Sequence, residues 1–446
     1  MATKLSVADR FYRARRIGTT FGRVYLRIKT NQFIARRIAP LDMEERWSAQ
    51  HAESATAIYE AAIELRGLIL KGCQFIGSRA DVLPPEYVQI LSRLQDRVPA
   101  KPFRSVRKTI EDELQCGLDD VFETFDQSPI AAASLAQVHA AVLHSGERVA
   151  VKVQYPEIET LVRSDLSNLR MLFRAVGVIE REIDLMPLVD ELGTQMPLEL
   201  DFVNEARNSE TIARFYEDRD DVYVPRVYWP YTTRRVLVSE LIDGIKISDV
   251  SSLRAAGVDP EQVMQTLIEA YCEQILTRGF FHADPHPGNL IVQPQAAENE
   301  RARLVFVDFG LAKELPPGFR RGVVELASAL VQGSAERMAQ ALSELGFETR
   351  EGGVPALHEL AKAVLETAVR LRQQSWVDRD VAGEAGQELP RMIRENPIVR
   401  VPSHVVLLGR VIGLLSGLGR SLEARIDMLQ IILPYVLRSA ESEEEG

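Results

Sequence analysis

The sequence has few cysteines and no apolar run long enough to cross a membrane. Only three cysteines occur among 446 residues, and Cys73, Cys116 and Cys272 lie far apart. This odd, scattered set excludes a disulfide framework and a cysteine-based zinc site, and it favours a reducing intracellular setting. The N-terminus lacks the apolar core of a signal peptide, so we expect a cytoplasmic protein.

The best candidate for a membrane span is residues 404–419, HVVLLGRVIGLLSGLG. This run is too short for a span and is interrupted by Arg410, so it predicts a buried helix.

Charge is unevenly distributed along the chain. The net charge is −11, but residues 1–40 carry ten Lys or Arg against one acidic residue, a local charge of about +9. Phe, Tyr and Ile interleave with these cations, which is typical of contact with an anionic membrane, although a solvated helix pair on the main body would look similar. The acidic remainder argues against nucleic-acid binding. The charge pattern leaves the oligomeric state open.

The order of elements indicates an α+β fold in several parts. Helical periodicity dominates residues 45–116, as in 55–70 and 83–100. Short β-rich runs follow, with a hairpin turn at 145–146, then helix over 157–215 and strands over 222–244. Helices dominate from 257, where Asp259 is a predicted N-cap. We therefore expect parts at 1–117, 118–244, 245–390 and 391–446, with a ligand site in a cleft between two lobes.

A lysine and a glutamate are the first candidate pair. Lys152 lies within the apolar strand VAVKVQ, where a buried ammonium needs an anionic partner such as a carboxylate or phosphate. Glu205, in the segment LELDFVNEARN, could reach it from a helix. A snorkelling edge lysine and a solvated acidic helix face are the structural alternatives.

The segment HADPHPGN carries the most distinctive pattern. Asp284 and Asn289 have the spacing D-x-x-x-x-N, in which kinases use the aspartate to accept a hydroxyl proton and the asparagine to hold Mg²⁺. A zinc reading would need His282 and His286 on one helix face, but the prolines at 285 and 287 make a regular helix improbable. The histidines are therefore expected to brace the loop.

The segment RLVFVDFG supplies a second metal-type residue. Asp308 follows a predicted buried strand and begins Asp-Phe-Gly, the kinase arrangement for a Mg²⁺-holding carboxylate. The runs NLIVQ and RLVFVDFG can pair as a hairpin, which would return Asn289 and Asp308 to one place. Four motifs in kinase order indicate a nucleotide–Mg²⁺ site.

With these residues together, the sequence resembles the UbiB/AarF family of atypical kinase-like proteins over roughly residues 60–330. Beyond HADPHPGN and DFG, the likeness rests on a K-x-G-Q-like segment at 71–99, an alanine-rich loop in SPIAAASLAQVHAA and an E-x-D motif in LELDF. The resemblance implies a protein-kinase-like two-lobe fold with an N-terminal helical extension and a helical C-terminal region.

The resemblance also implies roles at matching positions. ATP and Mg²⁺ are the expected cofactors, with Asp284, Lys152 and Glu205 catalytic and Asn289 and Asp308 as metal ligands. Lys71, facing Glu199, and Gln74 would lie over the active site. The nucleotide would be covered by the alanine-rich loop, which comprises Ala131, Ala132, Ala133 and Ser134.

Three features depart from ordinary kinases or from the family. Cys73 stands where the K-x-G-Q segment of the family has glycine. How this segment docks therefore depends on whether that position needs a positive φ. Alanines favour helix and would stiffen the nucleotide loop. No A-P-E motif follows Asp308, and helices are expected from about 316, so an ordinary peptide-docking segment is not evident.

These features favour a slow ATPase, or a phosphotransferase acting on a small or lipid-linked molecule. By resemblance it would support isoprenoid-quinone or lipid metabolism. The alternatives are a protein kinase and a nucleotide-gated module that binds a lipid or partner.

Overall fold

The computed structural model describes residues 6–35, 43–77, 84–95, 100–179, 186–295, 301–349, 354–373, 398–400 and 403–444. The chain divides into two compact units. Unit 1 comprises residues 1–206 and 226–241, and unit 2 comprises 207–225 and 242–446. The expected boundary at 390 and the acidic end of the tail at 445–446 lie outside the described residues.

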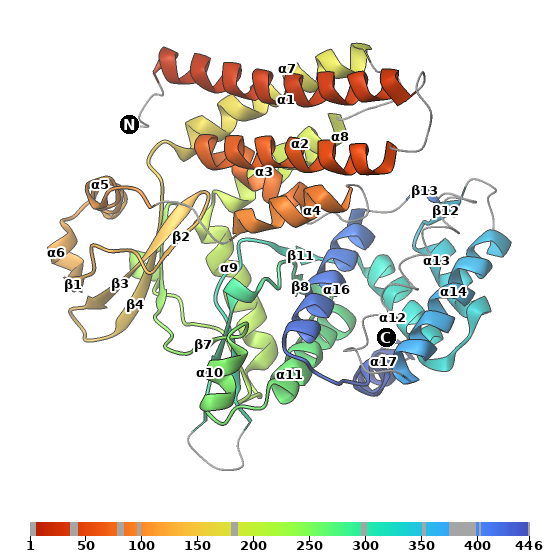
Figure 1. Ribbon diagram of the computed structural model, residues 1–446. Coiled ribbons are helices and arrows are strands. Elements are labelled where there is room, and N and C mark those ends of the chain that lie inside the picture. Colours follow the sequence, from red (N-terminus) through yellow and green to blue (C-terminus); the bar gives the residue numbers. More distant parts are fainter. Residues whose placement is uncertain are drawn as a thin grey trace. The chain divides into compact units, whose positions relative to one another are not determined.

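Unit 1 begins with helices and continues into a small antiparallel sheet (Figure 1). Its helices are α1 (Val7–Ala35), α2 (Met43–Leu65), α3 (Gly67–Gly77), α4 (Pro85–Leu91), η2 (Ser92–Gln95), α5 (Phe103–Leu114), α6 (Leu118–Val121), α7 (Ile158–Ile179), α8 (Met186–Glu199), the start of α9 (Phe202–Ala213) and η4 (Trp229–Tyr231). Its strands are β1 (Phe122–Phe125), β2 (Ala131–Ala132), β3 (Ala136–Leu143), β4 (Arg148–Gln154) and β6 (Val236–Glu240).

The sheet confirms the predicted hairpin at 145–146. Strands pair in the order β1-β3-β4-β6, with β2 against β3. Gly146 adopts a φ of 94°, a left-handed conformation that glycine reaches without a Cβ penalty. Alternate residues of β4 are buried: Val149, Val151 and Val153 have no exposed surface, as expected of a strand with one face on a core.

The helix predicted over 55–70 is broken near its C-terminal end. Arg66 and Gly67 both have positive φ values, 55° and 56°, so the chain turns between α2 and α3. A Cβ at Gly67 would lie 2.4 Å from the Cδ2 atom of Leu161 on α7. Glycine adopts this conformation without a Cβ penalty, and any Cβ here would have to push the Leu161 side chain aside.

The helices of unit 1 share a core with the ends of its strands. Leu68, Leu70 and Met196 are almost fully buried there with Leu135 and Tyr155, which flank β3 and β4. A buried ion pair also joins α1 to α7: the Arg13 guanidinium donates to both carboxylate oxygens of Asp165, at 2.9 and 2.6 Å. The first helix is thus packed against the body of unit 1.

Unit 2 is mainly helical. Its helical elements are η3 (Arg214–Tyr216), α10 (Val250–Ala255), α11 (Pro260–Cys272), the π-helix η5 (Glu273–Arg278), η6 (Pro287–Asn289), α12 (Pro317–Gln332), α13 (Ala335–Glu344), α14 (Val354–Gln373), α16 (Ser403–Ser421) and α17 (Met428–Glu444). Its strands are β5 (Val222–Tyr223), β7 (Ile245–Lys246), β8 (Phe280–His282), β9 (Leu290–Gln293), β10 (Arg303–Phe306), β11 (Ala312–Glu314), β12 (Glu348–Thr349) and β13 (Ile398–Arg400).

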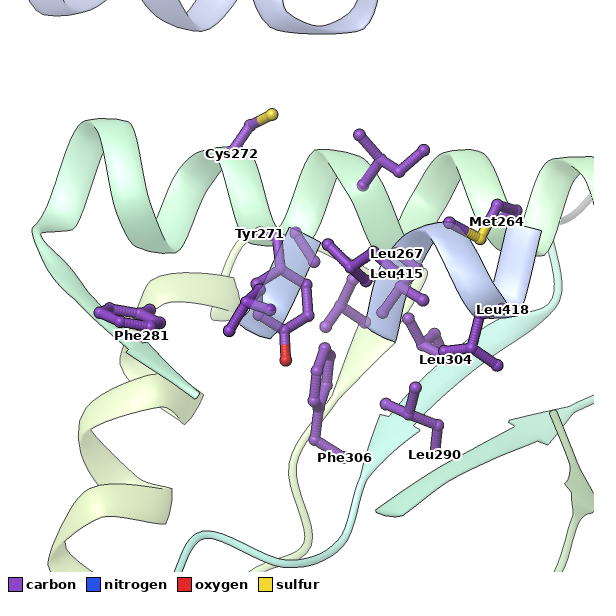
Figure 2. Packing of buried hydrophobic residues seen from close by; sticks show 14 of the residues in the cluster. Met264, Leu267, Tyr271, Cys272, Phe281, Leu290, Leu304, Phe306, Leu415 and Leu418 are labelled. Atoms are coloured by element: carbon purple, nitrogen blue, oxygen red, sulfur yellow. The ribbon is translucent and has the colours of Figure 1, made fainter. Parts of the chain in front are cut away.

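Helix α11 organises the core of unit 2. Asp259 caps it, accepting a hydrogen bond from the Glu261 backbone at 2.9 Å, as its sequence predicts. Figure 2 shows Leu267 and Tyr271 projecting from α11 toward Phe306 on β10. Strands β9 and β10 pair antiparallel, with Leu290 opposite Phe306, which confirms the predicted hairpin.

The apolar segment predicted as a buried helix is α16. Leu407, Val411 and Leu415 are buried in the core of unit 2, whereas Ile412 is 59% exposed, so burial is one-sided. None of the helices in the described ranges combines the length and apolar character that a bilayer crossing needs.

Candidate active site

The lysine–glutamate pair lies in unit 1. The Nζ atom of Lys152 on β4 is 2.6 Å from Oε1 of Glu205 on α9. The Glu205 side chain is 4% exposed and that of Lys152 is 17% exposed, so this is a nearly buried ion pair rather than a solvated acidic face. The ammonium also lies over the Phe202 ring, 5.2 Å from its centroid. The predicted contact is confirmed.

The E-x-D motif anchors the junction of two helices. Glu199 ends α8 and lies 3.0 Å from the Nζ atom of Lys71 on α3, which is the contact that the resemblance implied. Asp201 accepts a hydrogen bond from the Val203 backbone at 3.1 Å and so caps α9, the helix that carries Glu205. Gln74 lies in α3, but its side chain is outside the described residues.

Cys73 fits a regular helix. It lies within α3 and is not among the described non-glycine residues that have positive φ. Its side chain is 6% exposed and packs in the helical core, and burial raises the pKa of its thiol to about 12. The structure therefore accommodates a side chain where the family motif has glycine. Residues 78–83 and 96–99 of the K-x-G-Q-like segment lie outside the described residues.

The alanine-rich loop is extended rather than helical. Ala131 and Ala132 form β2, paired with Val138 and Gln137 of β3. The Ala133 backbone donates to the Ala136 carbonyl at 2.8 Å, and the Tyr155 hydroxyl donates to the Ala133 carbonyl at 3.0 Å. Pairing with β3 outweighs the helix propensity of alanine here. The backbone and tyrosine hydrogen bonds nevertheless hold the loop in place. Ser134, the last residue of the loop, is buried.

The catalytic-loop and metal-loop residues are brought together in unit 2. The Val307 backbone donates to the Asn289 carbonyl at 3.1 Å, next to Asp308. The Asn289 side chain donates from Nδ2 to the Asp284 carbonyl at 3.2 Å, which leaves its amide oxygen for other contacts. Asp308 Oδ1 accepts from the Gly310 backbone at 3.0 Å, which fixes the carboxylate.

His282 contacts the backbone of both the Asp284 loop and the Asp308 loop. Its Nε2 atom faces the Asp308 carbonyl, which can only accept, so Nε2 carries the proton. Its Nδ1 atom therefore accepts, from the Asp284 backbone at 3.3 Å and the Tyr271 hydroxyl at 3.2 Å. The neutral ring suits the site, because burial lowers the pKa of His282.

The two histidines do not form a zinc site. His286 accepts a hydrogen bond from the Gly288 backbone through Nδ1 at 3.1 Å, which caps the short turn η6. Within the described ranges, no group of three or more His, Cys, Asp or Glu residues is placed to hold a metal. The donors that could hold Mg²⁺ are the amide oxygen of Asn289 and the carboxylate of Asp308, hard oxygen ligands of the kind this ion takes alongside phosphate oxygens.

Several residues that hold the candidate site in place were not predicted from the sequence. The clearest is Arg410 of α16, whose Nη2 atom is 2.8 Å from Oδ1 of Asp284. Its signal was a lone charge inside an apolar helix, a position that requires an anionic partner. Gln274 accepts from the His282 backbone at 2.7 Å, and Asn208 donates to the Phe309 carbonyl at 3.2 Å. Gln274 points inward from the π-helix η5, a rare geometry that is frequent at functional sites.

Comparison with known proteins gives the family of this chain. The model of the ABC1 atypical kinase-like domain matches residues 93–342. The chain is 33% identical to the Arabidopsis thaliana protein ACTIVITY OF BC1 COMPLEX KINASE 8, chloroplastic, over 90% of this chain and 56% of that protein. It is 32% identical to the Gallus gallus AarF domain-containing protein kinase 1, over 85% of this chain and 73% of the relative.

A solved structure shows the same fold. The Mycobacterium tuberculosis protein Rv3197, determined in complex with erythromycin, has a TM-score of 0.60 and 23% identity, covering 87% of this chain and 97% of that chain.

The chain therefore belongs to the UbiB/AarF family, whose shared unit is the ABC1 atypical kinase-like domain, and it has a kinase-like α+β fold. It spans just over half the length of the first two plant relatives.

Proposed function

We propose that this chain binds ATP with Mg²⁺ and acts as a slow ATPase or as a phosphotransferase toward a small or lipid-linked acceptor. The observation that carries this proposal is the β9–β10 hairpin, which places Asn289 beside the Asp308 segment through a 3.1 Å backbone hydrogen bond. Membership of the ABC1 atypical kinase-like family supports it.

Each residue has a chemical role in the proposed reaction. Lys152, held by Glu205, binds nucleotide phosphate oxygens. Asn289 and Asp308 would hold Mg²⁺, which neutralises charge on the phosphates. Asp284 orients the attacking hydroxyl or water and accepts its proton while the bond from phosphorus to the leaving ADP oxygen breaks.

The absence of a peptide-docking motif favours a small acceptor over a protein. Helix α12 begins at Pro317, soon after Gly310, and the sequence contains no A-P-E motif in between. We propose that the activity supports isoprenoid-quinone or lipid metabolism in the cytoplasm. Transfer of labelled phosphate to a protein acceptor would instead favour the protein-kinase alternative.

A peripheral membrane role of α1 is a separate part of the proposal. Arg10, Arg23 and Arg27 are exposed on α1, and Phe11 is 71% exposed among them. Arg13 and Arg16 are paired with Asp165 and Glu64, and the exposed Arg27 is paired with Glu53, so only part of the basic arm is available for a membrane. Vesicle flotation of the chain with and without residues 1–40 tests this role, and equal recovery would contradict it.

The decisive experiment is thermal-shift binding of ATP and ADP with and without Mg²⁺. A ligand that binds only the folded state raises the melting temperature by mass action. We expect a Mg²⁺-dependent rise in the wild type that Asp308→Asn abolishes and Lys152→Met reduces, because Asp308 is proposed to hold the metal ion and Lys152 to bind phosphate oxygens. No rise in a well-folded wild type would contradict the proposal.

The same thermal-shift assay on Asp284→Asn, combined with a measurement of ATP turnover, separates an enzyme from a nucleotide-gated module. Asp284→Asn should keep the nucleotide-dependent rise in melting temperature and lose ATP turnover. If the biological function survives in Asp284→Asn, the module is the better description.

A further inference from the structure

Gln274 is a buried polar residue to which the proposed reaction assigns no role. It lies in the π-helix η5, directly after α11, and its side chain is fully buried. A π-helix is rare and is frequently found at functional sites. A polar side chain buried there needs hydrogen-bond partners, and those of Gln274 lead to the neighbouring loops.

The amide of Gln274 makes two hydrogen bonds in opposite directions. Its Oε1 atom accepts from the His282 backbone at 2.7 Å, and its Nε2 atom donates to the Tyr216 hydroxyl oxygen at 2.8 Å. The Tyr216 hydroxyl itself donates to the Ala270 carbonyl at 2.9 Å, so its oxygen is left to accept from the amide. The orientation of the amide is therefore fixed, with its nitrogen toward Tyr216 and its oxygen toward His282.

His282 connects this amide to both loops of the candidate site. It ends β8 and lies two residues before Asp284, and its ring faces the Asp308 carbonyl. The ring also accepts a hydrogen bond from the Asp284 backbone at 3.3 Å. A shift of the His282 backbone would therefore displace contacts of the proposed proton acceptor and of the proposed metal-binding segment together.

The groups on the other side of the amide are held in the core of unit 2. Tyr216 is 4% exposed, and its ring lies nearly parallel to that of Phe306, with 6.5 Å between the centroids. The π-helix is joined to α12, because the Arg320 guanidinium donates to the Leu276 and Thr277 carbonyls at 3.0 and 3.2 Å. The hydrogen bonds of the amide are therefore made to groups that are themselves fixed.

We propose that Gln274 is a positioning residue for phosphoryl transfer. This inference rests on the proposed function, in which the loops of Asp284 and Asp308 serve one reaction. Gln274 acts through His282 rather than on a reacting atom. Loss of this restraint should lower the reaction rate more than the affinity for nucleotide, because misplacing a reacting group costs rate rather than binding.

The test begins with Gln274→Met, which removes both hydrogen bonds and keeps the approximate length of the side chain. It should lower turnover of Mg²⁺–ATP by about 10- to 100-fold and leave nucleotide affinity within about twofold of the wild type. Gln274→Glu should recover most of the turnover. A buried carboxyl group favours its neutral form, which has both a donor and an acceptor.

Tyr216→Phe is a milder variant that keeps the aromatic ring. It removes the hydroxyl that accepts from the Gln274 amide, so the amide is less firmly held. Turnover should fall about three- to tenfold, with nucleotide affinity unchanged. This variant gives a result even where Gln274→Met does not fold.

Gln137 provides the matched control. It is a buried glutamine on β3 whose Oε1 atom accepts from the Lys101 backbone at 2.7 Å, the same kind of contact that Gln274 makes to His282. Its Nε2 atom lies 2.9 Å from the His139 ring, so these side-chain contacts lie within unit 1. Gln137→Met should lower the melting temperature and leave turnover per folded molecule unchanged.

Hydrogen exchange of peptides that cover residues 280–289 and 303–310 reports on the two loops without any turnover. Exchange there should be faster in Gln274→Met and in Tyr216→Phe than in the wild type, whereas peptides of α12 should exchange at the wild-type rate. If the wild type hydrolyses no ATP, the proposed function fails, and exchange alone decides whether Gln274 holds the loops.

Four outcomes would overturn the inference. They are wild-type turnover in the folded Gln274 and Tyr216 variants, an equal loss of turnover per folded molecule in Gln137→Met, and unchanged exchange of both loop peptides. The fourth is a loss of nucleotide affinity as large as the loss of turnover, which would indicate general damage to the site rather than loss of positioning.

Discussion

Arg410 of α16 donates a hydrogen bond from Nη2 to Oδ1 of Asp284 at 2.8 Å. The arginine side chain is 9% exposed and the aspartate side chain is 22% exposed. A residue from the C-terminal helices therefore fixes the carboxylate proposed to receive the proton. Helix α16 is itself anchored in the core of unit 2 by Leu407, Val411 and Leu415, so the guanidinium is held in place.

Replacement of Arg410 by glutamine should reduce ATP turnover by about 10- to 100-fold with little change in nucleotide affinity. The loss frees the Asp284 carboxylate to rotate, and misplacing a reacting group costs rate rather than binding. Arg410→Lys retains the charge without the forked geometry and should recover part of the activity. Turnover assays and nucleotide titrations measure both effects.

Arg219 provides the matched control for this experiment. It is also a partly buried arginine of unit 2, 2.8 Å from Asp221 and 3.2 Å from Glu269, but it makes no contact with the catalytic loop in the described structure. Arg219→Gln should lower the melting temperature and leave turnover per folded molecule unchanged. Equal turnover in Arg410→Gln and wild type would contradict a positioning role for Arg410.

Glu205→Gln should weaken nucleotide binding as well as turnover. The Lys152 ammonium loses the carboxylate 2.6 Å away, and a largely buried cation without its partner moves or loses its charge. We expect about tenfold weaker ATP binding and a larger loss of turnover, measured by titration and steady-state kinetics. The control is Glu157→Gln, which removes the partner of Lys101 in another ion pair of unit 1 and should leave both quantities unchanged.

Local patterns predicted the elements whose causes are local. The turn at 145–146 and the Asp259 cap depend on residues within a few positions, and both are observed. The Lys152–Glu205 contact could be predicted only from the order of the kinase-like motifs along the chain. Hydrophobic periodicity gives no information about contacts between residues so far apart in sequence. The assigned roles of these residues remain predictions.

The remaining features depend on distant parts of the chain. At Gly67 the backbone comes close to Leu161 on α7, and no window around residue 67 contains that neighbour. The extended alanine loop is set by pairing with β3, which outweighs a propensity difference of a few tenths of a kcal/mol. The lone charge of Arg410 in an apolar helix indicated that it has an anionic partner. The sequence could not identify that partner as Asp284, because the contact joins residues far apart in the chain.

Stability should fall as the pH drops below about 6.5 and before the carboxylates titrate. Burial lowers the pKa of His282 and of His139 in the folded state, whereas unfolded histidine keeps its ordinary value near 6.5. Between the folded and unfolded pKa values the unfolded chain binds more protons, so each histidine lowers the unfolding free energy by up to about 1.4 kcal/mol per pH unit.

Urea unfolding between pH 7.5 and 5.0 measures this slope for each unit. His282→Gln should flatten the pH dependence of the transition assigned to unit 2, and His139→Gln should do the same for unit 1. His358→Gln is the control, because that histidine is partly exposed on α14. A slope that persists unchanged in both buried-histidine variants would contradict the assignment.

Thiol labelling should distinguish one cysteine from the other two. Burial raises the pKa values of Cys73 and Cys272 to about 12, so neither presents a thiolate in the folded state at neutral pH. Cys116 is only partly buried. An excess of a thiol reagent should therefore modify one group quickly in the native protein and three after denaturation, and Cys116→Ser should abolish the fast phase. Rapid native labelling of Cys73 would mean that α3 opens readily, contrary to the packing of this cysteine in the helical core of unit 1.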